Sequence, residues 1–128
     1  MTPEQKIKQL ILNLQARWSG ETAPDVNAEN IDEVFDAANE DWALQDSINE
    51  IRCSGIETGL KCDWSRHYES EAVAMQAVDG SWVGWTYWFG GGKHGEPEAM
   101  PWMEHAYDVD CAEEVKVVTV RTFTKPAA

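Results

Sequence analysis

The chain has 128 residues, of which 43% are hydrophobic and 26% charged, and its formal net charge is −13. This length and composition predict a single globular domain over residues 1–128. The strong excess of acid argues against direct binding to nucleic acid or to an anionic membrane, and no apolar run approaches the roughly 18 residues of a membrane-spanning helix.

The three cysteines, at positions 53, 62 and 111, are an odd number and include no Cys-x-x-Cys pair. This usage favours reduced thiols in a cytoplasmic protein. The first six residues also lack the basic region and apolar core that begin a signal peptide.

Residues 2–19 are expected to form an amphipathic helix. Thr2 suits the N-cap, Pro3 the first helical position and Gln5 the capping box, while Gly20 suits the left-handed residue that ends a helix. The apolar residues recur at the spacing of one buried stripe: Ile7, Leu10, Ile11, Leu14 and Trp18.

A second helix is predicted to begin near Asn30, whose side chain can cap it, with Glu33 three residues later. Its narrow apolar stripe, which Trp42 is expected to continue, consists of Ile31, Val34, Phe35 and Ala38. The apolar pattern then restarts in a different phase, so residues 41–51 are predicted to be either a further helical segment or a bend.

The segment 21–50 contains ten acidic residues and no lysine or arginine. Five of these acids are expected on the polar side of the second helix and just beyond it: Asp32, Glu33, Asp36, Glu40 and Asp41. A field of one sign attracts basic partners, although the same composition also suits a solvated surface that only confers solubility.

The remainder of the chain has β character. Alternating runs at 64–78 and 81–89 flank Asp79-Gly80, which predicts a hairpin with a two-residue type I′ turn and pairs Ala77 with Trp82 and Ala74 with Trp85. Residues 115–124 are rich in β-branched side chains and predict a final strand.

The fold class expected from these elements is α+β. N-terminal amphipathic helices pack on a curved antiparallel sheet that is built from the 64–78/81–89 hairpin and the 115–124 strand. Residues 1–51 are mainly helical and acidic, residues 52–125 mainly β, and residues 126–128 a frayed tail.

The aromatic strand and the glycine-rich loop after it are a second candidate site. Trp85, Tyr87 and Trp88 are either core residues, the apolar walls of a pocket or an interface, and Lys93, His94 and Glu96 would supply polar groups at the mouth of such a pocket. The loop matches neither a phosphate-binding P-loop nor a dinucleotide-binding motif. Neither a zinc-binding motif nor a recognisable cysteine nucleophile is present, so no cofactor and no metal are assigned.

Three hypotheses of function follow. The leading one is a small acidic, non-enzymatic binding protein whose five acids engage a basic surface of another macromolecule; a nucleic-acid-mimicking inhibitor of a nucleic-acid-binding protein is one form of it. The alternative is a small-molecule-binding domain or enzyme with a Trp/Tyr-lined pocket in a cone-like α+β fold. The third is homodimerisation through an uncovered aromatic face of the sheet.

Overall fold

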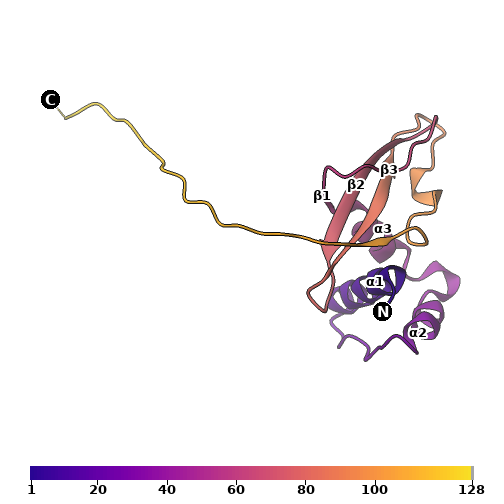
Figure 1. Cartoon of the computed structure of the whole chain (residues 1–128). Helices are drawn as coiled ribbons and strands as arrows, with labels where there is room; N and C mark the ends of the chain where they lie inside the picture. Colours follow the sequence, from indigo (N-terminus) through magenta and orange to yellow (C-terminus); the bar gives the residue numbers. More distant parts are fainter. Residues whose placement is uncertain (128) are drawn as a thin grey trace.

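The computed structural model describes residues 1–127 and shows three α-helices beside a four-stranded antiparallel sheet (Figure 1). Ala128, the last residue of the predicted tail, lies outside the described residues. The α+β class predicted from the sequence is confirmed. Within the described residues no helix is long and apolar enough to cross a bilayer.

The first helix, α1, spans Pro3–Ser19 and has the predicted ends. Thr2 Oγ1 accepts a hydrogen bond from the Gln5 amide at 3.2 Å, and Gln5 Oε1 accepts one from the Thr2 amide at 3.0 Å. These two bonds satisfy amides that the first turn of a helix otherwise leaves without partners. Gly20 closes the helix with φ +68°. Its apolar stripe faces the sheet, except that Trp18 is exposed.

The acidic segment forms two short helices joined by a tight bend. Helix α2 spans Ile31–Ala38, the 3₁₀ turn η1 spans Glu40–Trp42, and α3 spans Gln45–Cys53. The predicted capping bond of Asn30 is not formed, because Asn30 Oδ1 accepts from the Asn27 amide instead, at 2.7 Å. Residues 41–51, predicted to be either a further helical segment or a bend, thus contain both: the bend at Asp41 and Trp42 and the first part of α3.

The sheet has the strand order β1-β2-β3-β4, with β1 at Ile56–Glu57, β2 at Glu69–Gln76, β3 at Trp82–Phe89 and β4 at Tyr107–Val109. The predicted strand at 64–78 therefore begins later, at Glu69. The predicted register between the two strands of the hairpin, β2 and β3, is wrong by one residue.

The hairpin between β2 and β3 has a three-residue loop, in which the Ala77 amide donates to the Ser81 carbonyl at 2.7 Å. Asp79 has an ordinary negative φ and only Gly80 is left-handed, at φ +90°, which is the arrangement of a type I turn followed by a bulge. Asp79 Oδ1 also accepts from the Ser81 amide at 2.9 Å. The longer loop places Val73, not Ala74, opposite Trp85.

One face of the sheet packs on the helices to form the core. Trp85 is fully buried there, 5.5 Å from the ring of Trp102 between centroids, and its Nε1 donates to the Arg52 carbonyl at 3.2 Å. The core cluster joins residues of all three helices to the sheet. At the other end of the sheet, Lys6 of α1 makes a 2.7 Å ion pair with Asp108 of β4.

The opposite face of the sheet is largely covered by the chain itself. Tyr107 lies directly over Gly84, where an added Cβ would come within 2.7 Å of the tyrosine ring. The segment after β1 contributes Cys62, whose Sγ lies 3.4 Å from Ser70 Oγ. Trp88 also lies on this face and is buried.

The predicted final strand at 115–124 does not form. From Asp110 to Ala127 the chain is extended without any ladder partner and runs away from the domain (Figure 1). A strand needs another strand to bond with, and β-branched content alone does not provide one. We refer to residues 110–127 as the arm and to residues 1–109 as the body.

Candidate functional site

Four exposed acids and one exposed tryptophan lie together in sequence on α2 and η1, and we call this group the acidic surface: Glu33, Asp36, Glu40, Asp41 and Trp42. Helix α2 positions the first two of them. Its residues Ile31 and Phe35 are buried in the core and Val34 packs against it, so Glu33 and Asp36 lie on the opposite, exposed side of the helix. None of the four acids forms an ion pair within residues 1–127.

Asp32, the fifth predicted acid, behaves differently because it is compensated from within the chain. Its carboxylate lies 3.0 Å from Lys8 Nζ and also accepts from Gln5 Nε2 at 3.2 Å. The hydrogen bonds from Lys8 and Gln5 lower the pKa of Asp32 below its ordinary value. Burial lowers the pKa of Lys8, but the bond with Asp32 and the nearby charges of Glu4, Asp32 and Asp36 outweigh it, so that pKa is raised. Asp32 therefore joins α1 to α2 rather than presenting free charge.

Trp42 is the most unexpected member of the acidic surface. It does not continue the apolar stripe of α2 but is 77% exposed. The cause is a reversal of the backbone at Asp41 and Trp42, which have φ of +55° and +63°. Two consecutive non-glycine residues in this region carry conformational strain, and a bulky residue there is uncommon. The strained backbone directs a large aromatic ring into solvent beside the carboxylates.

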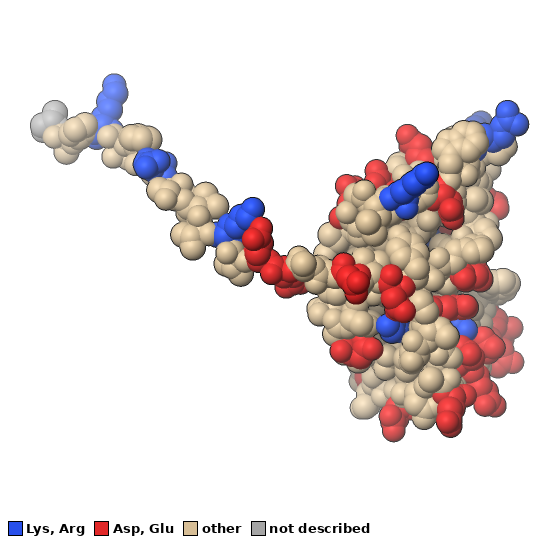
Figure 2. Space-filling view, in the orientation of Figure 1, with Lys and Arg blue, Asp and Glu red and all other residues tan. Residues whose placement is uncertain are grey.

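The charges of the molecule are unevenly distributed. Figure 2 shows acidic side chains gathered over the lower part of the body, where Figure 1 places α2, and basic side chains spaced along the arm. The body therefore presents a negative field that is strongest where no cation lies between the acids.

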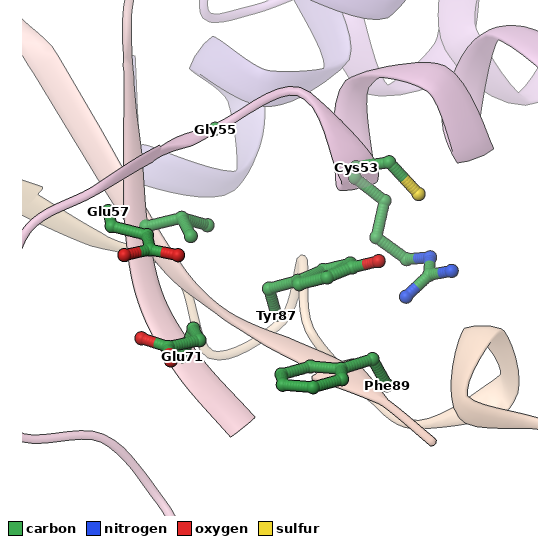
Figure 3. Close-up of a pocket in the computed structure, with 8 residues that line it drawn as sticks. Cys53, Gly55, Glu57, Glu71, Tyr87 and Phe89 are labelled. Atoms are coloured by element: carbon green, nitrogen blue, oxygen red, sulfur yellow. The ribbon is translucent and has the colours of Figure 1, made fainter. Parts of the chain in front are cut away.

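A second feature is a cavity of about 300 Å³ between the end of α3 and the edge of the sheet. Figure 3 shows Tyr87 and Phe89 side by side along it, with Cys53 near the tyrosine hydroxyl and the carboxylates of Glu57 and Glu71 at the other end. The two rings stack with centroids 5.4 Å apart. This volume is at the lower limit of ordinary ligand pockets.

Arg52 lines the cavity and is itself buried. Its Nη1 donates to the Trp88 carbonyl at 2.8 Å, its Nε donates to Asn49 Oδ1 at 3.1 Å, and its guanidinium lies 5.2 Å from the centre of the Tyr87 ring. These contacts tie α3 to β3. Much of the hydrogen-bonding capacity of the guanidinium is therefore already used within the fold.

The chemistry available at this cavity is limited at neutral pH. Burial raises the pKa of Tyr87, and the hydrogen bond and charge of neighbouring Cys53 raise it further, against the lowering effect of Arg52. Since the ordinary pKa of tyrosine is already about 10, the Tyr87 hydroxyl remains protonated near pH 7. It can donate a hydrogen bond but does not act as a base there.

The structure does not bring together the residues predicted to form a Trp/Tyr-lined pocket. Trp85 and Trp88 are core residues on opposite faces of the sheet, and of the three predicted walls only Tyr87 lines the cavity. Lys93 and His94 are exposed in the loop after β3. Glu96 is also exposed, and its amide donates to the Tyr68 hydroxyl at 3.2 Å.

The three cysteines are free thiols, with Cys53 and Cys111 exposed. Among residues 1–127, no group of three His, Cys, Asp or Glu side chains is gathered closely enough to hold a metal ion. Searches for similar proteins, by family model, among curated proteins and among solved structures, find no match to this chain.

Sequence reasoning found the acids of this site but missed its aromatic member. Trp42 fits the helical period of the α2 stripe, so periodicity placed it in the core. The signal against this was the run Asn39-Glu40-Asp41 before it, because asparagine and aspartate are the residues that most readily leave helical geometry.

Proposed function

We propose that this chain is a non-enzymatic binding protein whose acidic surface engages a basic surface of another macromolecule, with Trp42 as the anchor. The observation that carries this proposal is the position of Trp42, which is 77% exposed at φ +63° and close in sequence to four acids that form no ion pair within residues 1–127. A fold gains no stability from an exposed tryptophan on a strained backbone. The arrangement is instead what a binding site requires.

Tryptophan is among the residues that contribute most to binding energy at protein interfaces, where it fills a desolvated pocket of the partner. Charged residues around such an anchor mainly select the partner and accelerate encounter. Trp42, which directly follows Glu40 and Asp41 and the acidic helix α2, has this composition. The acids then define a basic partner, and the ring supplies affinity that does not depend on salt.

A nucleic-acid-binding protein is the partner class that this pattern fits best. Such proteins present clusters of lysine and arginine that bind the row of phosphates along a nucleic-acid strand. Glu33 and Asp36 lie three residues apart on α2, and Glu40 and Asp41 follow within five residues, which gives four exposed carboxylates in nine residues. Bound to such a protein, these carboxylates would occupy the place of phosphates and exclude nucleic acid.

The test compares capture of lysate proteins by the wild-type chain and by two variants, with quantification by mass spectrometry. One variant is Trp42→Ala, and its matched control is Trp64→Ala, which removes another tryptophan that is 82% exposed. The other variant neutralises the four acids, and its control neutralises four exposed acids elsewhere: Asp63, Glu69, Glu98 and Glu104.

A basic protein retained by the wild-type chain and by both controls, but lost from Trp42→Ala and from the neutralised variant, is the expected result. Binding of that protein, once purified, should weaken with salt, since exposed charges are screened over about 8–10 Å at physiological ionic strength. Trp42→Ala should weaken it at every salt concentration. Equal capture by Trp42→Ala and Trp64→Ala would contradict the proposal.

A further inference from the structure

The arm exposes several large apolar side chains that do not pack against the body. Seven of the ten residues at 115–124 are valine or threonine, and the remaining three are Lys116, Arg121 and Phe123. Val115 and Val117 are each 98% exposed, and Phe123 is 86% exposed. An extended, β-prone segment with free backbone groups is a template for strand pairing. The arm therefore has the chemistry of a strand that is completed by another molecule.

The body has an edge that suits such a strand. β1 lies at one edge of the sheet and pairs with β2 over only two residues, after which the Thr58 amide donates to the Ala72 carbonyl at 2.9 Å. Its outer side has no strand beside it in the sheet of residues 1–127. Ile56, in β1, is 63% exposed and Leu60 50% exposed, which is unusual for apolar residues beside a sheet.

The arm begins directly after β4, at the opposite edge of the sheet from β1, but its first residues lie across a groove from β1. A groove of about 460 Å³ is lined on one side by residues 56–60 of β1 and its extension, and on the other by residues 109–113, where the arm begins. Its apolar lining consists of Ile56, Leu60, Ala74, Trp82 and Val109. Because residues 109–113 already lie across this groove from β1, the arm needs only a short path to reach the β1 edge of a neighbour related by a two-fold axis nearby.

The distribution of charge along the chain indicates that the neighbouring molecule is a second copy of the same chain. Residues 115–127 contain Lys116, Arg121 and Lys125 and no acid, whereas residues 1–114 contain all 23 acids of the chain and seven bases. Residues 115–127 are therefore cationic, whereas residues 1–114 are strongly anionic. Glu57 and Glu113 also line the groove and place negative charge where an incoming arm would lie. The chain thus carries both a basic, apolar strand and an anionic body with an open sheet edge.

We propose that two copies of this chain associate by exchanging arms, so that residues 115–124 of each copy add as a strand to the β1 edge of the other. A two-fold arrangement satisfies both arms at once, because donor and acceptor are present in each copy. Each exchanged strand pairs its backbone with β1, and its valines cover Ile56 and Leu60. This contact differs from the dimer expected from the sequence, since it uses the arm and not the aromatic strand.

The first test is sedimentation velocity of the full chain from about 1 to 100 µM. Successive amides of a strand point to opposite sides, so proline at both Val117 and Val118 removes pairing donors in either orientation. A matched control replaces the same two residues with threonine, which retains β-propensity. Both valine side chains lie outside the core, so the circular dichroism of the body should not change.

We expect a dimer that the proline variant weakens about tenfold or more in dissociation constant and that the threonine control largely preserves. Neutralising Glu33 and Asp36 should leave this dimer unchanged, which separates the arm exchange from the binding proposed for the acidic surface. A chain that stays monomeric over the whole range would overturn the proposal. So would a dimer that the two prolines do not weaken.

The second test locates the arm by disulfide formation between differently labelled copies in which the native cysteines are replaced by serine. One copy carries Ile56→Cys and the other carries single cysteine substitutions at positions 117 to 121 in turn. At least one arm position should cross-link efficiently to Ile56→Cys and poorly to Ser19→Cys, an exposed position at the end of α1. Equal cross-linking to both positions would show that the arm does not lie on β1.

Discussion

Replacing Trp85 with alanine should be one of the most destabilising single changes in this chain. The side chain is fully buried, packs 5.5 Å from Trp102 between ring centroids and donates to the Arg52 carbonyl at 3.2 Å. Burial of about 150–250 Å² at roughly 25 cal/mol per Å² corresponds to about 4–6 kcal/mol, which is an upper estimate because the unfolded chain already buries some surface. Measured Trp→Ala changes in cores, at about 3–5 kcal/mol, agree.

The expected loss for Trp85→Ala is therefore about 4 kcal/mol, out of a total stability of roughly 5–15 kcal/mol for a domain. Urea denaturation followed by far-ultraviolet circular dichroism measures it without depending on tryptophan fluorescence. Trp85→Phe keeps an aromatic ring but leaves the Arg52 carbonyl unpaired, and it should cost about 1–3 kcal/mol. It also provides a measurement if the alanine variant does not fold.

Trp64→Ala is the control, since a residue that is 82% exposed should change stability by no more than about 0.5 kcal/mol. If Trp85→Ala unfolds within about 1 kcal/mol of the wild-type chain, or if the control loses as much, then Trp85 is not the centre of the core. The aromatic strand would then be available for the pocket predicted from the sequence.

Three further changes test other parts of the structure. Trp42→Gly should raise the free energy of unfolding by about 1 kcal/mol while abolishing binding, because glycine adopts positive φ without strain; a destabilised variant in urea would contradict the strain argument. Lys8→Met removes the ion pair with Asp32 and should lower the free energy of unfolding by a constant amount near neutral pH. Because the pKa of Asp32 is lowered in the fold, the stabilisation from this pair is present above about pH 4 and is lost at lower pH. The difference in unfolding free energy between the two chains, measured as a function of pH, should therefore disappear in acid. Gly84→Ala should displace Tyr107, since the new Cβ would lie 2.7 Å from its ring, and hydrogen exchange of β4 amides should accelerate.

The helical half of the fold could be predicted from the sequence because its signals are local. In α1, the capping residues, the apolar period and the terminal glycine all indicate the same boundaries, and the structure has them within one residue. Helix α3 was less clear because its apolar residues follow a change of phase, whose cause is the left-handed backbone at Asp41 and Trp42. Strain of this kind is not encoded in hydrophobic periodicity.

The hairpin was predicted in kind but not in register. Asp-Gly suits both a two-residue type I′ turn and the second half of a type I turn with a bulge, since only the glycine needs positive φ in the latter. The hydrogen bonds from Ser81 to the Asp79 carboxylate favour the second form. A one-residue change in loop length then altered which side chains face one another across the strands.

The arm shows most clearly where prediction from a single chain reaches its limit. Its composition predicts a strand, and its exposed valines are those of a strand that lacks a neighbour. Helical signals can be satisfied within a few residues, whereas a strand depends on a partner that the sequence of the segment does not specify. Trp42 and the arm are thus two of the places where a local prediction disagrees with the structure, and both place large apolar side chains in solvent. Because natural chains generally agree with their own local preferences except where function requires otherwise, these two disagreements are where binding is expected.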